Sequence, residues 1–90
     1  MLGEAWSLSP SVALRPESFG ALAYHFGNRR LTFLKRPQLV NVVRDLDQHR
    51  DVGAALDAAG VTPDQRPAYV AALQDLARAD MIRPRQEATR

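Results

Sequence analysis

The stretch that decides the fold is residues 20–36, GALAYHFGNRRLTFLKR. Large apolar side chains occupy every second position in each of its two halves: Leu22, Tyr24 and Phe26, then Leu31 and Phe33. This period of two is typical of β-strands. The pair Gly27-Asn28 between the halves favours a tight turn. We therefore predict a hairpin whose apolar residues share one face.

Working outward toward the N-terminus, a third short strand is predicted before the hairpin. Val12 and Leu14 alternate with Ala13 and Arg15, and Pro10 and Pro16 are expected to bound the run. Two or three antiparallel strands with one apolar face result. Trp6, the only tryptophan, is expected to pin an N-terminal arm onto the core.

After residue 37 the apolar period becomes helical. The first predicted helix has the spacing i, i+3, i+4, i+7 and Pro37 in its first turn: Leu39, Val42, Val43 and Leu46. A second helix is predicted over residues 51–59 and ends at Gly60. A capping-box pattern over residues 62–65, and a turn or a kinked first turn at Pro67, precede a third helix that runs to about Ala79. The apolar face expected for it consists of Tyr69, Val70, Leu73, Leu76 and Ala77.

An apolar sheet face needs a covering layer, and three amphipathic helices supply one. Strands first and helices after indicate an α+β domain, and the short helices suit a winged helix-turn-helix-like fold with three N-terminal antiparallel strands followed by three helices. We expect one domain over residues 1–82, in which Met81 and Ile82 pack back on the core. Residues 83–90 are expected to be a flexible C-terminal tail, with Pro84 ending the ordered structure.

Composition excludes several classes of function. The 90 residues contain no cysteine, which removes disulfides, thiolate metal sites and cysteine nucleophiles. His25 and His49 lack metal-ligand spacing, and we expect both to be structural or exposed, His25 on the polar side of its strand. There is no phosphate loop or serine elbow. We predict a protein that is not an enzyme, uses no metal or cofactor, contacts no membrane and lies in the cytoplasm.

Charge is unevenly distributed along the chain. The net charge is +2, whereas residues 1–36 carry five basic and two acidic side chains, a net +3. Four of these cations fall within Arg29–Arg36, which holds no acid. Two interpretations stay open for this run: charges that protect an edge strand from aggregation, or an edge at which an acidic peptide docks as a further strand.

The N-terminal half also resembles a known family. The resemblance is carried by Trp6–Glu17, Phe19–Leu22, Tyr24–Gly27, Arg29–Leu31 and Phe33–Lys35, with Leu39 and Val42–Arg44 after them. These residues resemble the mycofactocin biosynthesis chaperones, a family of precursor-peptide recognition elements related to the pyrroloquinoline quinone chaperone. The similarity covers residues 6–82 and is densest between Trp6 and Lys35.

The resemblance implies a winged helix-turn-helix-like, non-catalytic peptide chaperone. It would hold the leader of the mycofactocin precursor peptide and present the peptide's C-terminal Val-Tyr to a radical S-adenosylmethionine maturase, which decarboxylates and crosslinks it. The leader would add as a strand beside the third strand and lie against the third helix. The implied leader-binding residues are Arg29, Arg30, Leu31, Thr32, Phe33, Leu34 and Lys35 on the strand, and Val70, Leu73, Gln74, Ala77 and Met81 on the helix side.

A winged-helix nucleic-acid-binding protein is the alternative, because it would share the helices and the cations. The third helix argues against it, because Arg66 and Arg78 stand beside Asp64, Asp75 and Asp80. We therefore expect no nucleic acid among the partners. An exposed edge strand leaves a homodimer open.

Overall fold

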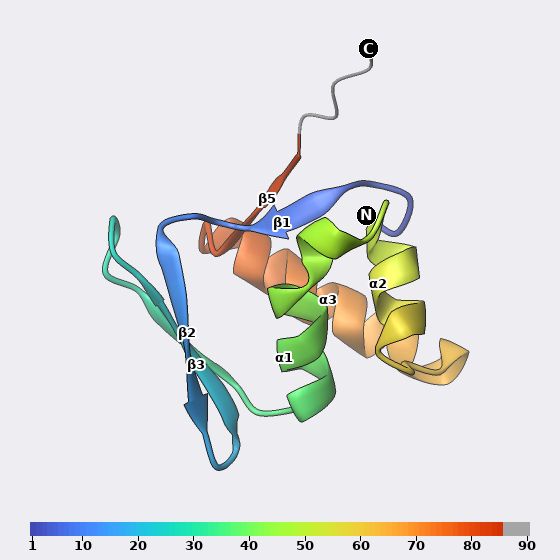
Figure 1. The fold of residues 1–90 in the computed structure, drawn as a ribbon, viewed down its shortest axis with the longest axis horizontal. Coiled ribbons are helices and arrows are strands. Elements are labelled where there is room, and N and C mark those ends of the chain that lie inside the picture. Colours follow the sequence, from blue (N-terminus) through green and yellow to red (C-terminus); the bar gives the residue numbers. More distant parts are fainter. Residues whose placement is uncertain (86–90) are drawn as a thin grey trace.

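The computed structural model describes residues 1–85, and Figure 1 shows the sheet formed within residues 12–34 at one end, with helix α1 (Pro37–Arg44) beside it and helix α2 (Val52–Ala58) farther away. The elements are β1 (Trp6–Leu8), β2 (Val12–Glu17), β3 (Gly20–His25), β4 (Leu31–Leu34), α1 (Pro37–Arg44), α2 (Val52–Ala58), α3 (Arg66–Arg78) and β5 (Ile82–Pro84), with single 3-10 turns η1 (Leu46–Gln48) and η2 (Pro63–Gln65). The predicted α+β class is confirmed. A strand that the prediction lacked, β1, makes four rather than three before the helices.

Strands β2, β3 and β4 form the predicted antiparallel sheet, in the order β2-β3-β4. Pro16 lies inside β2 rather than at its end, opposite Ala21. The amide of Phe26 donates to the carbonyl of Ser11, and hydrogen-bonded and non-bonded pairs alternate along the ladder from there. Pro16 therefore belongs to a non-bonded pair. Its nitrogen points to the open edge of β2, where no hydrogen-bond donor is needed.

The predicted facing of the sheet is wrong. The helices cover the inner face, which presents Ala21, Ala23 and His25 from β3. The larger side chains predicted to be buried point the other way, onto the outer face: Leu22, Tyr24, Phe26, Leu31 and Phe33. The core cluster takes the two alanines of β3, whose small side chains allow close packing. Period-two alternation is the same for both faces, so it could not show which one the helices cover.

His25 belongs to the core side of β3, not to a polar side. The residue is 5% exposed, and its Nδ1 accepts hydrogen bonds from the amides of Gly27 and Asn28 at 2.9 and 3.1 Å. The proton therefore sits on Nε2, which donates to Asp80 at 2.9 Å. This bond ties the β3–β4 turn to the end of α3 and gives the histidine the structural role that was predicted.

The predicted helices are confirmed with small changes at their ends. Asp51 caps α2 by accepting the amide of Ala54, and Gly60 follows α2 with φ +79°. The capping box over residues 62–65 is present. Pro67 stands in the first turn of α3, where its missing amide costs little. Leu46 is buried, but in η1 rather than in α1.

Residues 6–8 and residues 82–84 meet in a second sheet that the sequence did not reveal. Strand β1 pairs antiparallel with β5, and the amide of Arg85 donates to the carbonyl of Ala5 at 2.9 Å. Trp6 packs against the core, as predicted. Arg83 and Pro84 lie in β5, so the ordered structure extends past the predicted start of the tail. Residues 86–90 of that tail lie outside the described residues.

No helix within residues 1–85 is long and apolar enough to cross a bilayer. The same part of the chain holds no cluster of three or more histidine, aspartate and glutamate side chains placed to bind a metal ion.

Candidate functional site

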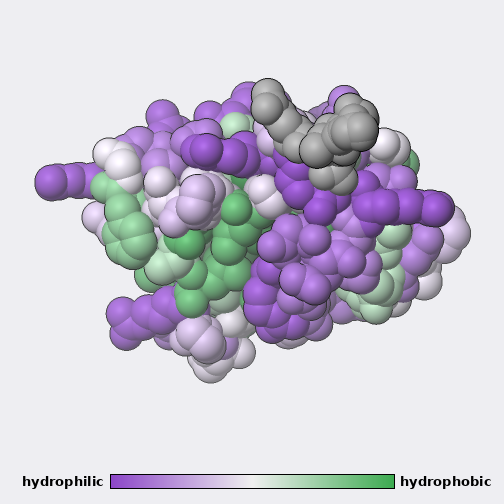
Figure 2. Space-filling view, turned by 45° about the horizontal axis from the view of Figure 1, so that its top comes forward, coloured by the Kyte–Doolittle hydropathy of each residue, from purple (hydrophilic) through white to green (hydrophobic). Residues whose placement is uncertain are grey.

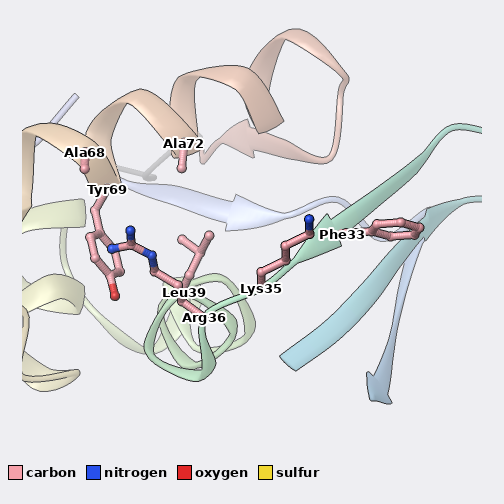
Figure 3. Close-up of a pocket in the computed structure, with 7 residues that line it drawn as sticks. All are labelled: Phe33, Lys35, Arg36, Leu39, Ala68, Tyr69 and Ala72. Carbon is pink, nitrogen blue, oxygen red and sulfur yellow. The ribbon is translucent and has the colours of Figure 1, made fainter. Parts of the chain in front are cut away.

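A groove runs between the edge strand β4 and helix α3 (Figure 3), and we call it the β4–α3 groove. It consists of two adjoining hollows of about 260 and 210 Å³. Its lining is Thr32, Phe33, Leu34, Lys35 and Arg36 from β4 and the following residues, Leu39 from α1, and Ala68, Tyr69, Ala72, Asp75 and Leu76 from α3. Each hollow is smaller than a typical small-molecule site, which begins near about 300 Å³. Their size suits single side chains of an extended peptide.

Small residues on α3 keep the groove open. Ala68 and Ala72 are one helical turn apart, so they share a face of α3. In Figure 3 both methyl groups point from the helix toward the groove, with Leu39 between the helix and the strand. Leu39 is 8% exposed and forms part of the apolar floor. Larger residues at the two alanine positions would close the space that the groove offers.

The backbone of β4 offers unpaired groups on the same side. Among the strands of residues 1–85, β4 pairs only with β3, so its other edge is open there. The amide of His25 donates to the carbonyl of Arg30 at 3.0 Å, which fixes the phase of the ladder. Paired positions alternate between hydrogen-bonded and non-bonded pairs. Thr32 therefore bonds to β3, whereas the N–H and C=O groups of Leu31 and Phe33 point to the open edge.

Charge at this edge is uncompensated. Within residues 1–85, none of Arg29, Arg30, Lys35 and Arg36 forms an ion pair with a carboxylate. By contrast, six other arginines do form one: Arg15, Arg44, Arg50, Arg66, Arg78 and Arg83. The unpaired cations flank both ends of β4. They produce a local positive field that favours an acidic ligand.

One of these cations is held in place at the α1 end of the groove. The guanidinium carbon of Arg36 lies 5.8 Å from the ring centroid of Tyr69, within range of a cation–π contact. Figure 3 shows the two side chains next to each other. Tyr69 donates its hydroxyl to Gln38 at 3.3 Å, and Gln38 donates to the carbonyl of Ala59 at 3.1 Å. This chain of contacts joins α1, α3 and the residues after α2 at one end of the groove.

Hydrogen bonding lowers the pKa of two carboxyl groups, and both lie outside the groove. The Trp6 indole lowers the pKa of Glu4, and the Arg44 guanidinium lowers the pKa of Asp45. Both shifts of pKa extend the ionisation of these carboxylates to lower pH. A general acid needs a shift in the opposite direction, so neither group has the signature of acid catalysis.

The structure places the predicted strand residues at the groove and the predicted helix residues elsewhere. Thr32, Phe33, Leu34 and Lys35 line it, and Arg29, Arg30 and Leu31 are exposed next to it. Leu34 is buried, so its side chain belongs to the core below the groove. On the helix side, Leu73 and Met81 are 0% exposed core residues, and none of the predicted set lines either hollow: Val70, Leu73, Gln74, Ala77 and Met81.

The residues that sequence reasoning missed are those on the neighbouring face of α3. Leu73 and Leu76 are buried in the core. With these two side chains packed there, the face of α3 that carries Ala68, Ala72 and Asp75 lies toward β4. The spacing of Ala68 and Ala72 was a signal in the sequence. It could not be used alone, because alanines four apart are common on any helix of this alanine-rich chain.

Comparison with known proteins gives one consistent result. The family described as the Peptide chaperone MftB family matches residues 5–83. A protein named Peptide chaperone MftB from Mycolicibacterium smegmatis is 50% identical over 80 residues, covering 89% of this chain and 78% of the relative. Proteins of the same name from Mycobacterium ulcerans and Mycobacterium tuberculosis are 48% and 47% identical over 81 residues, each covering 90% of this chain and 74% of the relative. No solved structure matches the chain.

Proposed function

Because this chain belongs to the peptide chaperone MftB family, we propose that it binds the leader of the mycofactocin precursor peptide in the β4–α3 groove. The chain is a non-catalytic peptide chaperone, in agreement with the prediction. The leader adds as an antiparallel or parallel strand beside β4, and its side chains on one face enter the hollows against α3.

The observation that carries this proposal is the open edge of β4. The amides and carbonyls of Leu31 and Phe33 point away from β3 and toward a groove whose opposite wall is α3. An extended peptide satisfies these groups whatever its side chains are, and Ala68 and Ala72 leave space for every second side chain. The binding mode therefore supplies affinity through the backbone and selectivity through the hollows.

The four unpaired cations support an acidic leader. Arg29 and Arg30 lie before β4, and Lys35 and Arg36 lie after it, so carboxylates at either end of an added strand find a positive partner. Such exposed pairs contribute modestly to affinity and more to the rate of association. Their contribution is expected to weaken as salt is added.

The chaperone's benefit to the reaction is an increase in effective concentration. We propose that it binds the leader with the groove and a radical S-adenosylmethionine maturase with another surface. The C-terminal Val-Tyr of the peptide then reaches the enzyme in an intramolecular step. No chemical step is assigned to the chaperone. The proposal also includes a cytoplasmic location and a winged helix-turn-helix-like relation of the helices to the β2–β4 sheet.

Calorimetric titration with the full precursor peptide and with a leaderless version tests the proposal. We expect calorimetry to show binding of the full peptide only. In NMR spectra of the same titration, we expect the amide chemical shifts of Leu31 and Phe33 to change. Equal binding of the two peptides, or shift changes confined to residues away from the groove, would contradict the proposed site.

The unpaired cations would also suit a nucleic acid, which the same titration can examine with duplex DNA at low salt. The structure gives α3 little to contribute to that function. Its two arginines are already paired within the protein, Arg66 with Asp57 and Arg78 with Asp75. Tight duplex binding that competes with the precursor peptide would replace the peptide proposal.

A further inference from the structure

The outer face of the β2–β4 sheet carries the main exposed apolar surface of the molecule. The chain has three phenylalanines, and all three are exposed: Phe19 by 40%, Phe26 by 61% and Phe33 by 60%. Leu31 is 57% exposed on the same face. Of the five large apolar residues that are exposed within residues 1–85, only Leu2 lies elsewhere. Figure 2 shows apolar side chains gathered over the half of the molecule that holds the sheet.

These side chains form a continuous aromatic surface rather than isolated exposed residues. The rings of Phe19 and Phe33 lie 5.8 Å apart between centroids, and those of Tyr24 and Phe26 lie 5.4 Å apart. Register places Leu22 opposite Phe33 and Tyr24 opposite Leu31. We call this set the aromatic face: Phe19, Leu22, Tyr24, Phe26, Leu31 and Phe33. Its length follows the six residues of β3, about 20 Å at about 3.3 Å per residue.

Exposure of all the phenylalanines needs an explanation, because phenylalanine is usually buried and a contiguous apolar patch of this kind marks an interaction surface. The helices leave this face uncovered, because they pack against Ala21 and Ala23 on the other side of β3. We propose that the aromatic face is the docking surface for the peptide-modifying maturase. This inference rests on the proposed function, and it assigns the second surface that delivery of the peptide requires.

The leader itself does not fit as the occupant of the aromatic face. An added strand lies in the plane of the sheet beside β4, so it covers the edge and not the face. Phe19 and Phe26 lie beyond opposite ends of β3, which is separated from an added leader strand by β4. Both phenylalanines therefore stay exposed with the leader in place. The occupant must therefore be a broad protein surface.

Charge selects against a second copy of this chain. The whole sheet lies within residues 1–36, which carry a net charge of +3. Two sheets packed face to face would bring these like charges together. A partner whose apolar patch is bordered by carboxylates would instead meet the unpaired cations beside β4 favourably.

Continuity with the leader site favours the enzyme. Phe33 lines the β4–α3 groove and also contributes its ring to the aromatic face. A leader strand beside β4 would turn alternate side chains outward and so extend the aromatic face. A maturase seated there would contact chaperone and leader together, which couples docking of the enzyme to the loaded chaperone.

The test measures binding of the purified maturase to the full-length chaperone loaded with precursor peptide, by biolayer interferometry. The variants are Phe26→Ser and the double variant Phe19→Ser/Phe26→Ser, and the matched control is Leu2→Ser, which removes the exposed apolar residue outside the aromatic face. We expect about tenfold weaker enzyme binding or more for the face variants, as for aromatic side chains that anchor an interface. Leu2→Ser is expected to bind the enzyme as the original chain does.

Separate readouts distinguish this inference from the proposed function. Leader affinity, measured by calorimetry, is expected to stay within about twofold in all three variants. Unchanged enzyme binding in both face variants would overturn the inference while leaving leader capture intact. A wild-type dimer that Phe26→Ser dissociates in sedimentation analysis would also overturn it, because the aromatic face would then belong to a second copy.

Discussion

Successive backbone amides of β4 point alternately to β3 and to the groove. Proline substitutions at two adjacent residues of β4 should therefore have different effects. Replacing Phe33 by proline removes an amide at the open edge, whereas replacing Thr32 by proline removes one that bonds to β3. Proline is tolerated in an edge strand when its nitrogen faces away from the sheet. Phe33→Pro should therefore fold, and Thr32→Pro should lose stability.

The expected magnitude follows from one lost hydrogen bond. Phe33→Pro is compared with Phe33→Ala, so loss of the ring cancels and the missing amide remains. A net hydrogen bond contributes about 0.5–1.5 kcal/mol, and a leader carbonyl left without a donor raises the cost to about 1–3 kcal/mol. Leader binding should therefore be about fivefold to 150-fold weaker in Phe33→Pro than in Phe33→Ala.

Two assays check this reasoning. Fluorescence anisotropy with a labelled leader peptide gives the ratio of affinities for the Phe33 pair. Thermal unfolding compares Thr32→Pro with Thr32→Ala, and the proline variant should unfold at the lower temperature. Equal leader affinities in two folded Phe33 variants would refute strand addition at β4. Equal stability in the Thr32 pair would refute the phase of the ladder.

Three further predictions follow from the site and its support. Arg30→Glu should weaken binding of an acidic leader most at low salt, and an effect that does not change between 50 and 500 mM salt in anisotropy titrations would exclude the electrostatic contribution. Ala72→Phe should fill the groove and weaken leader binding about tenfold or more without loss of stability. The control Ala71→Phe changes an exposed position outside the groove and should bind the leader normally. Similar calorimetric affinities of the two variants would place the leader elsewhere. Gly20→Ala should lower the free energy of unfolding, measured with urea, by about 1–3 kcal/mol from backbone strain alone, because φ at this position is +146°. The added Cβ would also lie 2.1 Å from the carbonyl oxygen of Leu34, and an unchanged unfolding midpoint would contradict that close approach.

The candidate site was predicted in part. Residues Arg29–Lys35 are at the groove or next to it because an edge strand displays its own consecutive residues, which local sequence can show. Six residues that line the groove were not predicted as site residues: Leu39, Ala68, Tyr69, Ala72, Asp75 and Leu76. Arg36, which also lines it, was included only in the basic run interpreted as a possible docking edge. Which side of α3 meets β4 depends on how the helix rotates to bury Leu73, and that rotation is set by packing against core residues from distant parts of the chain.

What the sequence by itself determined was the kind, order and approximate ends of the elements. Period-two and helical spacing, the capping residues and Pro37 all act within a few neighbours, so they can be found along the chain. Only the tertiary structure decided which sheet face is covered, where His25 points, and that β1 pairs with β5. These features depend on packing between distant segments. Both faces of an alternating strand follow the same pattern, and the small Ala21 and Ala23 rather than the larger side chains meet the helices.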